Sequence, residues 1–139
     1  MSEYLFSYGT LLPEHAPSEV AETVAQLRRV GKGSVRGVLY DLGEFPGAVL
    51  DESSRKKIVG TVFLLPDGAK ILRKLDEYEG FKPRAPRRSL FIRKRYPVTL
   101  SNGRTLHCWV YLYNKRPGAS PILTSGRYRK KRARSQKRS

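Results

Sequence analysis

The feature that most constrains the fold is a pair of strand-like segments joined by a tight turn. The segments are residues 88–100 and 105–113, and the turn is Ser101-Asn102-Gly103. Asn-Gly favours the turns of β-hairpins, since both residues tolerate positive φ. Successive side chains of a strand point to opposite faces. One face of the second segment is wholly apolar and the other is aromatic and polar: Leu106, Cys108, Val110 and Leu112 against His107, Trp109, Tyr111 and Tyr113. The pattern predicts an antiparallel hairpin with at least one buried face.

Shorter segments predict four more strands. They are the aromatic-rich residues 4–8, the alternating residues 34–42, residues 48–50 after a Phe-Pro-Gly turn, and residues 58–65, which are apolar on both faces. The connections between them are mostly too short for crossovers, so neighbouring strands are expected to pair antiparallel.

Two helices are predicted between these strands. The first covers residues 19–29, with Ser18 as its N-cap and residues 31–33 as its end, and the second covers residues 67–79 and ends at Gly80. Strands and helices together indicate an α+β fold, a small mixed, mostly antiparallel β-barrel with two helices.

Charge divides the chain at Glu79, its last acidic residue. Residues 1–79 carry 10 Lys/Arg and 12 Asp/Glu (net −2), whereas residues 80–139 carry 18 Lys/Arg and no acidic residue (net +18). The charge is densest near the C-terminus, and dense like charge has little to bury. We therefore predict a folded domain over residues 1–114 and a basic, disordered tail over residues 115–139.

The remaining composition favours a small cytoplasmic protein. The single cysteine, Cys108, cannot form an intramolecular disulfide, which suits a reducing compartment. No apolar run approaches the roughly 20 residues of a membrane-spanning helix, and the first residues lack the pattern of a signal peptide. The two histidines and the cysteine have no ligand spacing, so we expect no metal site. We also expect a monomer that does not bind a membrane.

A strand that meets a glycine at Gly9 is the first candidate site. The glycine permits a tight turn and the close approach of a ligand to bare backbone. The N–H groups around Gly9, Thr10 and Leu11 would then converge on one anion or oxyanion. The alternative is an ordinary strand-to-turn junction, with Tyr8 as a core aromatic.

Glu79 is the second candidate. On a helical wheel it shares a face with Leu72 and Leu75, whereas Glu77 points away. Desolvation and the negative end of the helix dipole both disfavour a charged carboxylate there, so both raise its pKa toward the range of a general base. The alternative is a frayed last turn in which Glu79 faces solvent or pairs with a nearby arginine.

Two motifs in this order and spacing resemble the γ-glutamylcyclotransferase superfamily, in particular its γ-glutamylamine cyclotransferase-like and AIG2-like branch. Tyr8-Gly9-Thr10-Leu11 is similar to the family's Tyr-Gly-(Ser/Thr)-Leu substrate loop, and residues 75–80 (Leu-Asp-Glu-Tyr-Glu-Gly) are similar to its Leu-Asp-x-x-Glu-Gly motif. The resemblance covers roughly residues 4–114. The family commonly has a tyrosine in the following strand, where this chain has Phe91.

The resemblance implies a cofactor-independent enzyme that converts a small γ-glutamyl amine or γ-glutamyl-amino acid into 5-oxoproline and a free amine. It implies that Glu79 is the general acid/base. It also implies that the backbone of Tyr8, Gly9, Thr10 and Leu11 binds the substrate. Two alternatives stay open: a cyclotransferase-like fold that binds a small metabolite without turnover, and a protein that binds nucleic acid non-specifically through its basic tail.

Overall fold

The computed structural model describes residues 3–9, 16–43 and 45–128. In this part of the chain, six strands, two helices and one 3-10 turn follow one another in the order β1 (Glu3–Ser7), α1 (Ser18–Ala25), β2 (Arg28–Asp41), β3 (Pro46–Leu50), β4 (Lys57–Leu65), α2 (Gly68–Glu79), η1 (Pro86–Arg88), β5 (Phe91–Leu100) and β6 (Thr105–Tyr113). Neither described helix has the length and apolar character needed to span a membrane.

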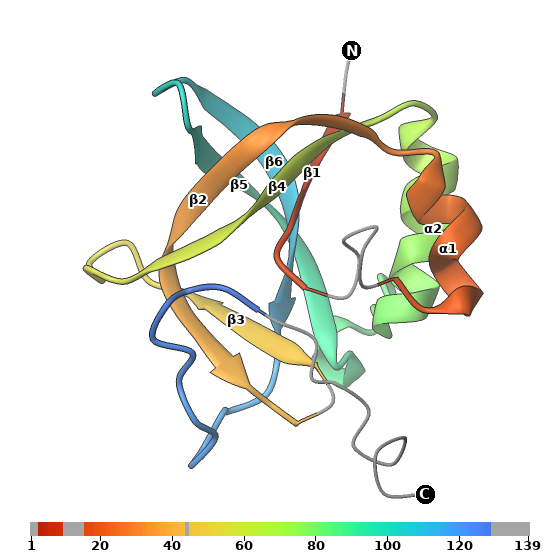
Figure 1. The fold of residues 1–139 in the computed structure, drawn as a ribbon. Helices are drawn as coiled ribbons and strands as arrows, with labels where there is room; N and C mark the ends of the chain where they lie inside the picture. Colours follow the sequence, from red (N-terminus) through yellow and green to blue (C-terminus); the bar gives the residue numbers. More distant parts are fainter. Residues whose placement is uncertain (1–2, 10–15, 44, 129–139) are drawn as a thin grey trace, which may run out of the picture.

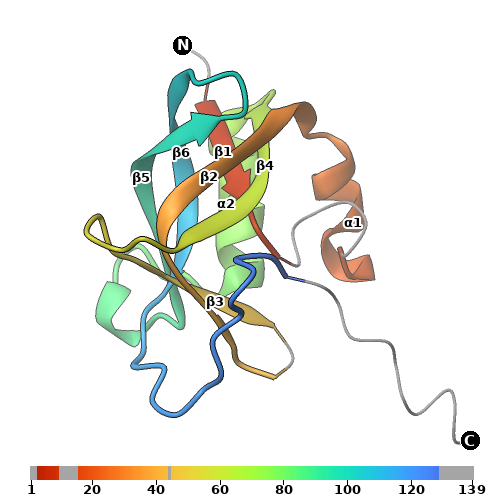
Figure 2. The same cartoon turned by 60° about the vertical axis from the view of Figure 1, so that its left-hand side comes forward.

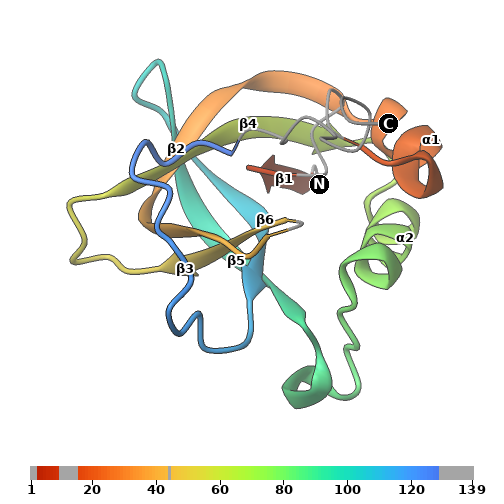
Figure 3. The same cartoon turned by 60° about the horizontal axis from the view of Figure 1, so that its bottom comes forward.

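The strands form a closed barrel with one added strand. Their order is β3-β2-β4-β1-β6-β5, and β2 also pairs with β5, which closes five strands into a barrel and leaves β3 outside the closure. The β1–β6 pair is parallel, through Leu5 and Trp109, and the other pairs are antiparallel. Both helices lie together on one side of this barrel (Figures 1 and 3). The predicted α+β fold, a small mixed, mostly antiparallel barrel with two helices, is confirmed.

The first helix is shorter than predicted. It ends at Ala25, and residues 31–33 lie inside β2, where they pair with β4 instead of terminating the helix. Gly33 explains the difference, because β2 meets β5 there to close the barrel. A Cβ on Gly33 would lie 2.8 Å from a methyl of Val98, so this glycine serves close strand approach. Ser18 is also the first helical residue rather than the N-cap, which is Pro17.

The apolar residues form two cores, one inside the barrel and one between the barrel and the helices. The interior core contains Phe6, Tyr8, Val35, Leu39, Ala48, Ile58, Val62, Val98, Leu100, Cys108, Val110 and Leu112. The helix-side core contains Leu5, Val20, Val24, Leu27, Phe63, Leu65, Ile71, Leu72, Leu75, Phe91 and Tyr111. Strand β6 contributes to both, as its alternation predicts. Burial raises the pKa of the Cys108 thiol to about 12, so the thiol stays protonated at neutral pH.

Residues 115–128 return along the barrel after β6, at the end that also carries β3 (Figure 2). The backbone N–H of Asp41 donates to Pro121 O, that of Leu123 to Leu39 O, and that of Val59 to Gly126 O, each at 2.8 Å. The predicted disordered tail began at residue 115, and these bonds tie its described portion to β2 and β4. Residues 129–139 lie outside the described residues, so for them the tail stays a prediction.

Candidate active site

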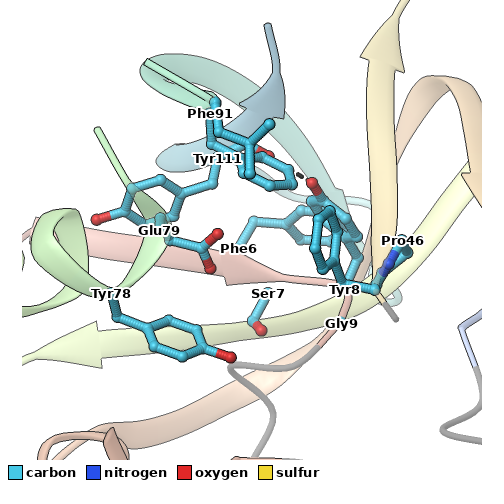
Figure 4. Close-up of a pocket in the computed structure, with 11 residues that line it drawn as sticks. Phe6, Ser7, Tyr8, Gly9, Pro46, Tyr78, Glu79, Phe91 and Tyr111 are labelled. Atoms are coloured by element: carbon cyan, nitrogen blue, oxygen red, sulfur yellow. Dashed lines mark hydrogen bonds between the residues drawn. The ribbon is translucent and has the colours of Figure 1, made fainter. Parts of the chain in front are cut away.

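A cavity of about 240 Å³ opens where the ends of β1 and α2 meet the beginnings of β3 and β5 (Figure 4). Among the described residues, one carboxylate and four hydroxyls line it, together with mostly apolar groups. Its described lining consists of Phe6, Ser7, Tyr8, Gly9, Phe45, Pro46, Tyr78, Glu79, Leu90, Phe91 and Tyr111. These residues come from five separate segments, and the closure of the barrel brings them together.

Glu79 is the last residue of α2, and its carboxylate points into the cavity (Figure 4). Gly80 ends the helix directly after it, in the left-handed conformation (φ 73°) that glycine adopts without strain. Burial raises the pKa of Glu79 to about 8, and the negative charge of Asp76 adds to the rise. Among the described residues, none donates a hydrogen bond to this carboxylate. Such a group can accept and return a proton near neutral pH.

Asp76 lies one helical turn before Glu79 and has the opposite surroundings. Its two oxygens accept hydrogen bonds from Nε and a terminal nitrogen of Arg93 at 2.8 and 3.0 Å, and from the Tyr111 hydroxyl at 2.7 Å. The Arg93 guanidinium lies 4.3 Å from the centre of the Trp109 ring. The network joins the end of α2 to β5 and β6. Of the two carboxylates, only that of Glu79 has no such partner among the described residues.

The sequence alone did not reveal this network. On the helical wheel Asp76 lies at the border of the buried face, and nothing in the local pattern couples it to Arg93, which is 17 residues away. The alternation of β6 does place Tyr111 opposite the apolar face, but it does not distinguish a packing tyrosine from one that lines a cavity.

Tyr8 and Gly9 lie at the cavity, as two members of the predicted substrate loop. The buried Tyr8 hydroxyl donates to the backbone oxygen of Tyr111 at 2.5 Å. Burial raises the pKa of Tyr8 far above its ordinary value, and the charge of Glu79 adds to the rise. A Cβ on Gly9 would lie 2.7 Å from Cγ of Pro46, so the site requires glycine there. The other two members, Thr10 and Leu11, lie outside the described residues.

The sequence matches the γ-glutamyl cyclotransferase, AIG2-like family over residues 5–130. The chain belongs to this family. Solved structures with the same fold include YkqA from Bacillus subtilis, which is 20% identical with a TM-score of 0.70; the match covers 100% of this chain and 44% of YkqA. An AIG2-like protein from Mus musculus is 18% identical with a TM-score of 0.68, covering 92% and 88% of the two chains. A γ-glutamyl cyclotransferase is 16% identical with a TM-score of 0.60, covering 81% and 67%.

At these identities the structural matches establish the fold and not the reaction. No curated protein matches the sequence significantly. The AIG2-like γ-glutamyl cyclotransferase family acts on small γ-glutamyl compounds. A small cavity of this kind is therefore the first place in this chain to look for a binding site.

Phe91, where the chain departs from the family pattern, lies at this cavity. Phe91 lines the wall and packs against the rings of Phe45 and Tyr113, with both centroids 5.7 Å away. It contributes no hydroxyl. The four lining hydroxyls belong instead to Ser7, Tyr8, Tyr78 and Tyr111.

Two of these hydroxyl groups, those of Ser7 and Tyr78, were not singled out from the sequence. Ser7 lies one residue before the Tyr8-to-Leu11 motif, and Tyr78 lies one residue before Glu79. Their position beside these candidate residues was the sequence signal that could have indicated them. His107 is exposed on β6, away from this lining. In the described part of the chain no three His, Cys, Asp or Glu side chains cluster as a metal site would require.

Proposed function

We propose that the protein is a γ-glutamylcyclotransferase-like enzyme that converts a γ-glutamyl amine or γ-glutamyl-amino acid into 5-oxoproline and the free amine. The observation that carries the proposal is the Glu79 carboxylate, which lies in a small cavity without a hydrogen-bond or ion-pair partner among the described residues. Its pKa is raised to about 8, and the chain belongs to this family. The oxygens of the neighbouring Asp76 are instead occupied by hydrogen bonds from Arg93 and Tyr111.

In the proposed reaction the ionised Glu79 carboxylate takes a proton from the α-amino group of the substrate. The freed nitrogen attacks the side-chain carbonyl carbon, so a C–N bond forms and the carbonyl oxygen becomes negative. Collapse of this intermediate breaks the original amide bond, and Glu79 returns its proton to the departing amine. All atoms of both products come from the substrate. A cavity that holds the substrate curled brings the two reacting atoms together.

The substrate cradle in this proposal is the backbone of Tyr8, Gly9, Thr10 and Leu11. Its N–H groups would bind the developing oxyanion, since fixed donors stabilise charge that appears in the transition state. The bond from Tyr8 to Tyr111 O supports this role because it holds the start of the loop against β6.

The direct test is 5-oxoproline release from a panel of γ-glutamyl-amino acids, γ-glutamyl amines and a γ-glutamyl-ε-lysine compound. Release from at least one member is expected. No release from any member, combined with binding of one of them, would favour a metabolite-binding protein. No release and no binding, together with salt-sensitive binding of nucleic acid, would favour the basic C-terminal segment as the functional part.

The titration of Glu79 predicts how activity depends on pH. A base must be ionised to act, so kcat/KM should rise with pH and level off above about 8, the pKa of Glu79. The measurement is a pH profile of kcat/KM on the best substrate of the panel. A profile that levels off near pH 5 would mean that an ordinary carboxylate is the base and would count against this assignment.

The free energy of unfolding should also depend on the ionisation of Glu79, and it should fall as pH rises. The pKa of Glu79 is raised from 4.5, so the folded state binds the proton more tightly than the unfolded state. The stability that this proton contributes is complete below about pH 4.5 and is lost as pH rises through about 8. Urea unfolding at pH 5 and pH 8 should therefore show a steeper loss in wild type than in Glu79→Gln, and equal losses would contradict the shift.

The loop from Gly80 to Leu90 predicts a preference among leaving groups. Both of its ends adjoin the cavity, because it begins after Glu79 and finishes at a lining residue. The buried hydroxyl of Ser89 braces it by accepting from the Lys82 N–H at 2.7 Å. Its exposed cations have no ion-pair partner among the described residues: Lys82, Arg84, Arg87 and Arg88. A positive rim without acidic residues attracts anions.

Leaving amines that carry a carboxylate should therefore be preferred. Reversing charge in Arg87→Glu/Arg88→Glu is expected to lower kcat/KM for γ-glutamyl-glutamate about 3- to 10-fold relative to γ-glutamyl-lysine, and the effect should shrink at high salt. The matched control is Arg28→Glu/Arg29→Glu, at the other end of the barrel. Along β4, Arg28 pairs with Leu64, whereas Ser7, at the cavity, pairs with Thr61. An equal change for both substrates, or in both double variants, would refute the preference.

A further inference from the structure

The Ser7 hydroxyl is an unsatisfied polar group at the cavity. Ser7 ends β1 and is only 4% exposed, and its Oγ has no hydrogen-bond partner among the described residues. Figure 4 shows this hydroxyl near the hydroxyl end of Tyr78, and Tyr78 and Glu79 line the same cavity. Ser7 belongs to the cavity lining, so whatever fills the cavity reaches this group.

An empty hydrogen-bonding position of this kind needs an explanation. A buried hydroxyl without a partner destabilises a protein, and such groups are rare in native proteins unless water or a ligand meets them. Alanine or valine would fill the end of a strand without that penalty. Ser7 is therefore better understood as part of a binding site than as part of the core.

The neighbouring hydroxyls are already committed to bonds within the protein. Tyr8 donates its proton to the backbone oxygen of Tyr111, and Tyr111 donates its own to Asp76. Each phenol has one proton to donate. Ser7, in contrast, still has its proton available for a ligand.

The charge of the cavity indicates which ligand group Ser7 meets. The described lining contains no Lys, Arg or His and a single carboxylate, Glu79. A γ-glutamyl compound brings an α-amino group, which suits Glu79, and an α-carboxylate, which needs N–H or O–H donors when it leaves water. We propose that Ser7 donates a hydrogen bond to the α-carboxylate of the γ-glutamyl substrate and of the 5-oxoproline product. The ligand named here rests on the proposed function.

The test compares two ligands that differ only in the carboxylate. Calorimetric titration of wild type and Ser7→Ala with 5-oxoproline and with 2-pyrrolidinone, the same ring without its carboxylate, isolates the predicted bond. The variant should bind 5-oxoproline roughly ten- to hundredfold more weakly, as expected for a lost bond to a charged group, and 2-pyrrolidinone within about twofold of wild type. With substrate, KM should rise while kcat stays nearly constant, because the bond is present in ground and transition states alike.

A ligand-free measurement separates binding from a structural role. Because Ser7→Ala removes an unsatisfied hydroxyl, its Tm without ligand should equal or exceed that of wild type. A lowered Tm, together with weaker binding of both ligands, would mean that Ser7 is a packing residue. An equal loss of affinity for both ligands would mean that Ser7 bonds to the ring carbonyl and not to the carboxylate. Either result overturns the proposal. Unchanged binding of 5-oxoproline by Ser7→Ala, with turnover intact in wild type, overturns this inference alone. A wild type that neither binds nor releases 5-oxoproline overturns the proposed function and this inference with it.

Discussion

Replacing Glu79 by glutamine is expected to abolish 5-oxoproline release, with kcat lowered about 10²- to 10⁴-fold, the usual contribution of a general acid/base. Glutamine has nearly the same shape but cannot take the proton from the α-amino group or return it to the leaving amine. Asp76 cannot substitute, because Arg93 and Tyr111 occupy both of its oxygens. The effect should therefore appear in kcat at every pH at which the wild type is active.

The matched control for this variant is Glu77→Gln. It makes the same chemical change two residues earlier on α2, at an exposed position outside the cavity lining. We expect Glu77→Gln to keep activity within about twofold, since exposed substitutions of this kind rarely alter a site. Thermal unfolding should show that both variants are folded at neutral pH. If Glu79→Gln kept more than about a third of the wild-type kcat, another group would have to be the base.

Asp76→Ala is expected to lower the free energy of unfolding by about 3–5 kcal/mol, the usual result of removing one partner from a buried ion pair. The substitution leaves the Arg93 guanidinium without its anion and the Tyr111 hydroxyl without its acceptor. The side chains of Arg93 and Asp76 are only 15% and 7% exposed, so water cannot fully replace these bonds. Urea unfolding followed by circular dichroism measures the loss.

Arg95→Ala supplies the control, because Arg95 forms the other ion pair of the described residues, with Glu3. Its side chain is 49% exposed, and pairs of this kind contribute about 0–1 kcal/mol. Both arginines lie on β5 and both contact the Trp109 ring, so the two ion pairs differ chiefly in burial. Losses of similar size in Asp76→Ala and Arg95→Ala would mean that the Asp76 network does not hold the end of α2.

The Asp76 network also bears on catalysis, because Asp76 lies one turn before Glu79 on α2. Its bonds to Arg93 and Tyr111 hold the end of the helix against β5 and β6. If that end shifts, the Glu79 carboxylate shifts with it. In Asp76→Ala we therefore expect lowered kcat even under conditions in which the variant is folded, since small displacements of a catalytic group reduce rates steeply.

Local sequence patterns were sufficient for the elements and the class of fold. The alternation in β6 predicted which side chains face each core, and the Asn-Gly pair predicted the hairpin that joins β5 and β6. The wheel placed Glu79 on the buried face of its helix and Glu77 away from it, as the structure has them. These features depend on neighbours within about four residues, and such spacing is visible in a sequence.

The boundaries of β2 depended on distant pairing. Gly31 and Gly33 look like a helix end in the sequence, yet they belong to a strand of 14 residues that pairs with β4, β5 and β3. The contact of Gly33 with Val98 joins residues 65 positions apart. No local preference of a glycine distinguishes a helix end from such a close approach.

The sequence by itself determined the strands and helices, the mixed barrel, the family, and which helix end carries the candidate carboxylate. Only the tertiary structure decided that Asp76 pairs with Arg93 and that Tyr8 bonds to the backbone of Tyr111, 103 residues later. It also decided that the Ser7 hydroxyl has no partner among the described residues. The physical reason is that periodicity and turn chemistry act between near neighbours. Hydrogen bonding and desolvation in the cavity depend instead on which strands the closed barrel brings side by side.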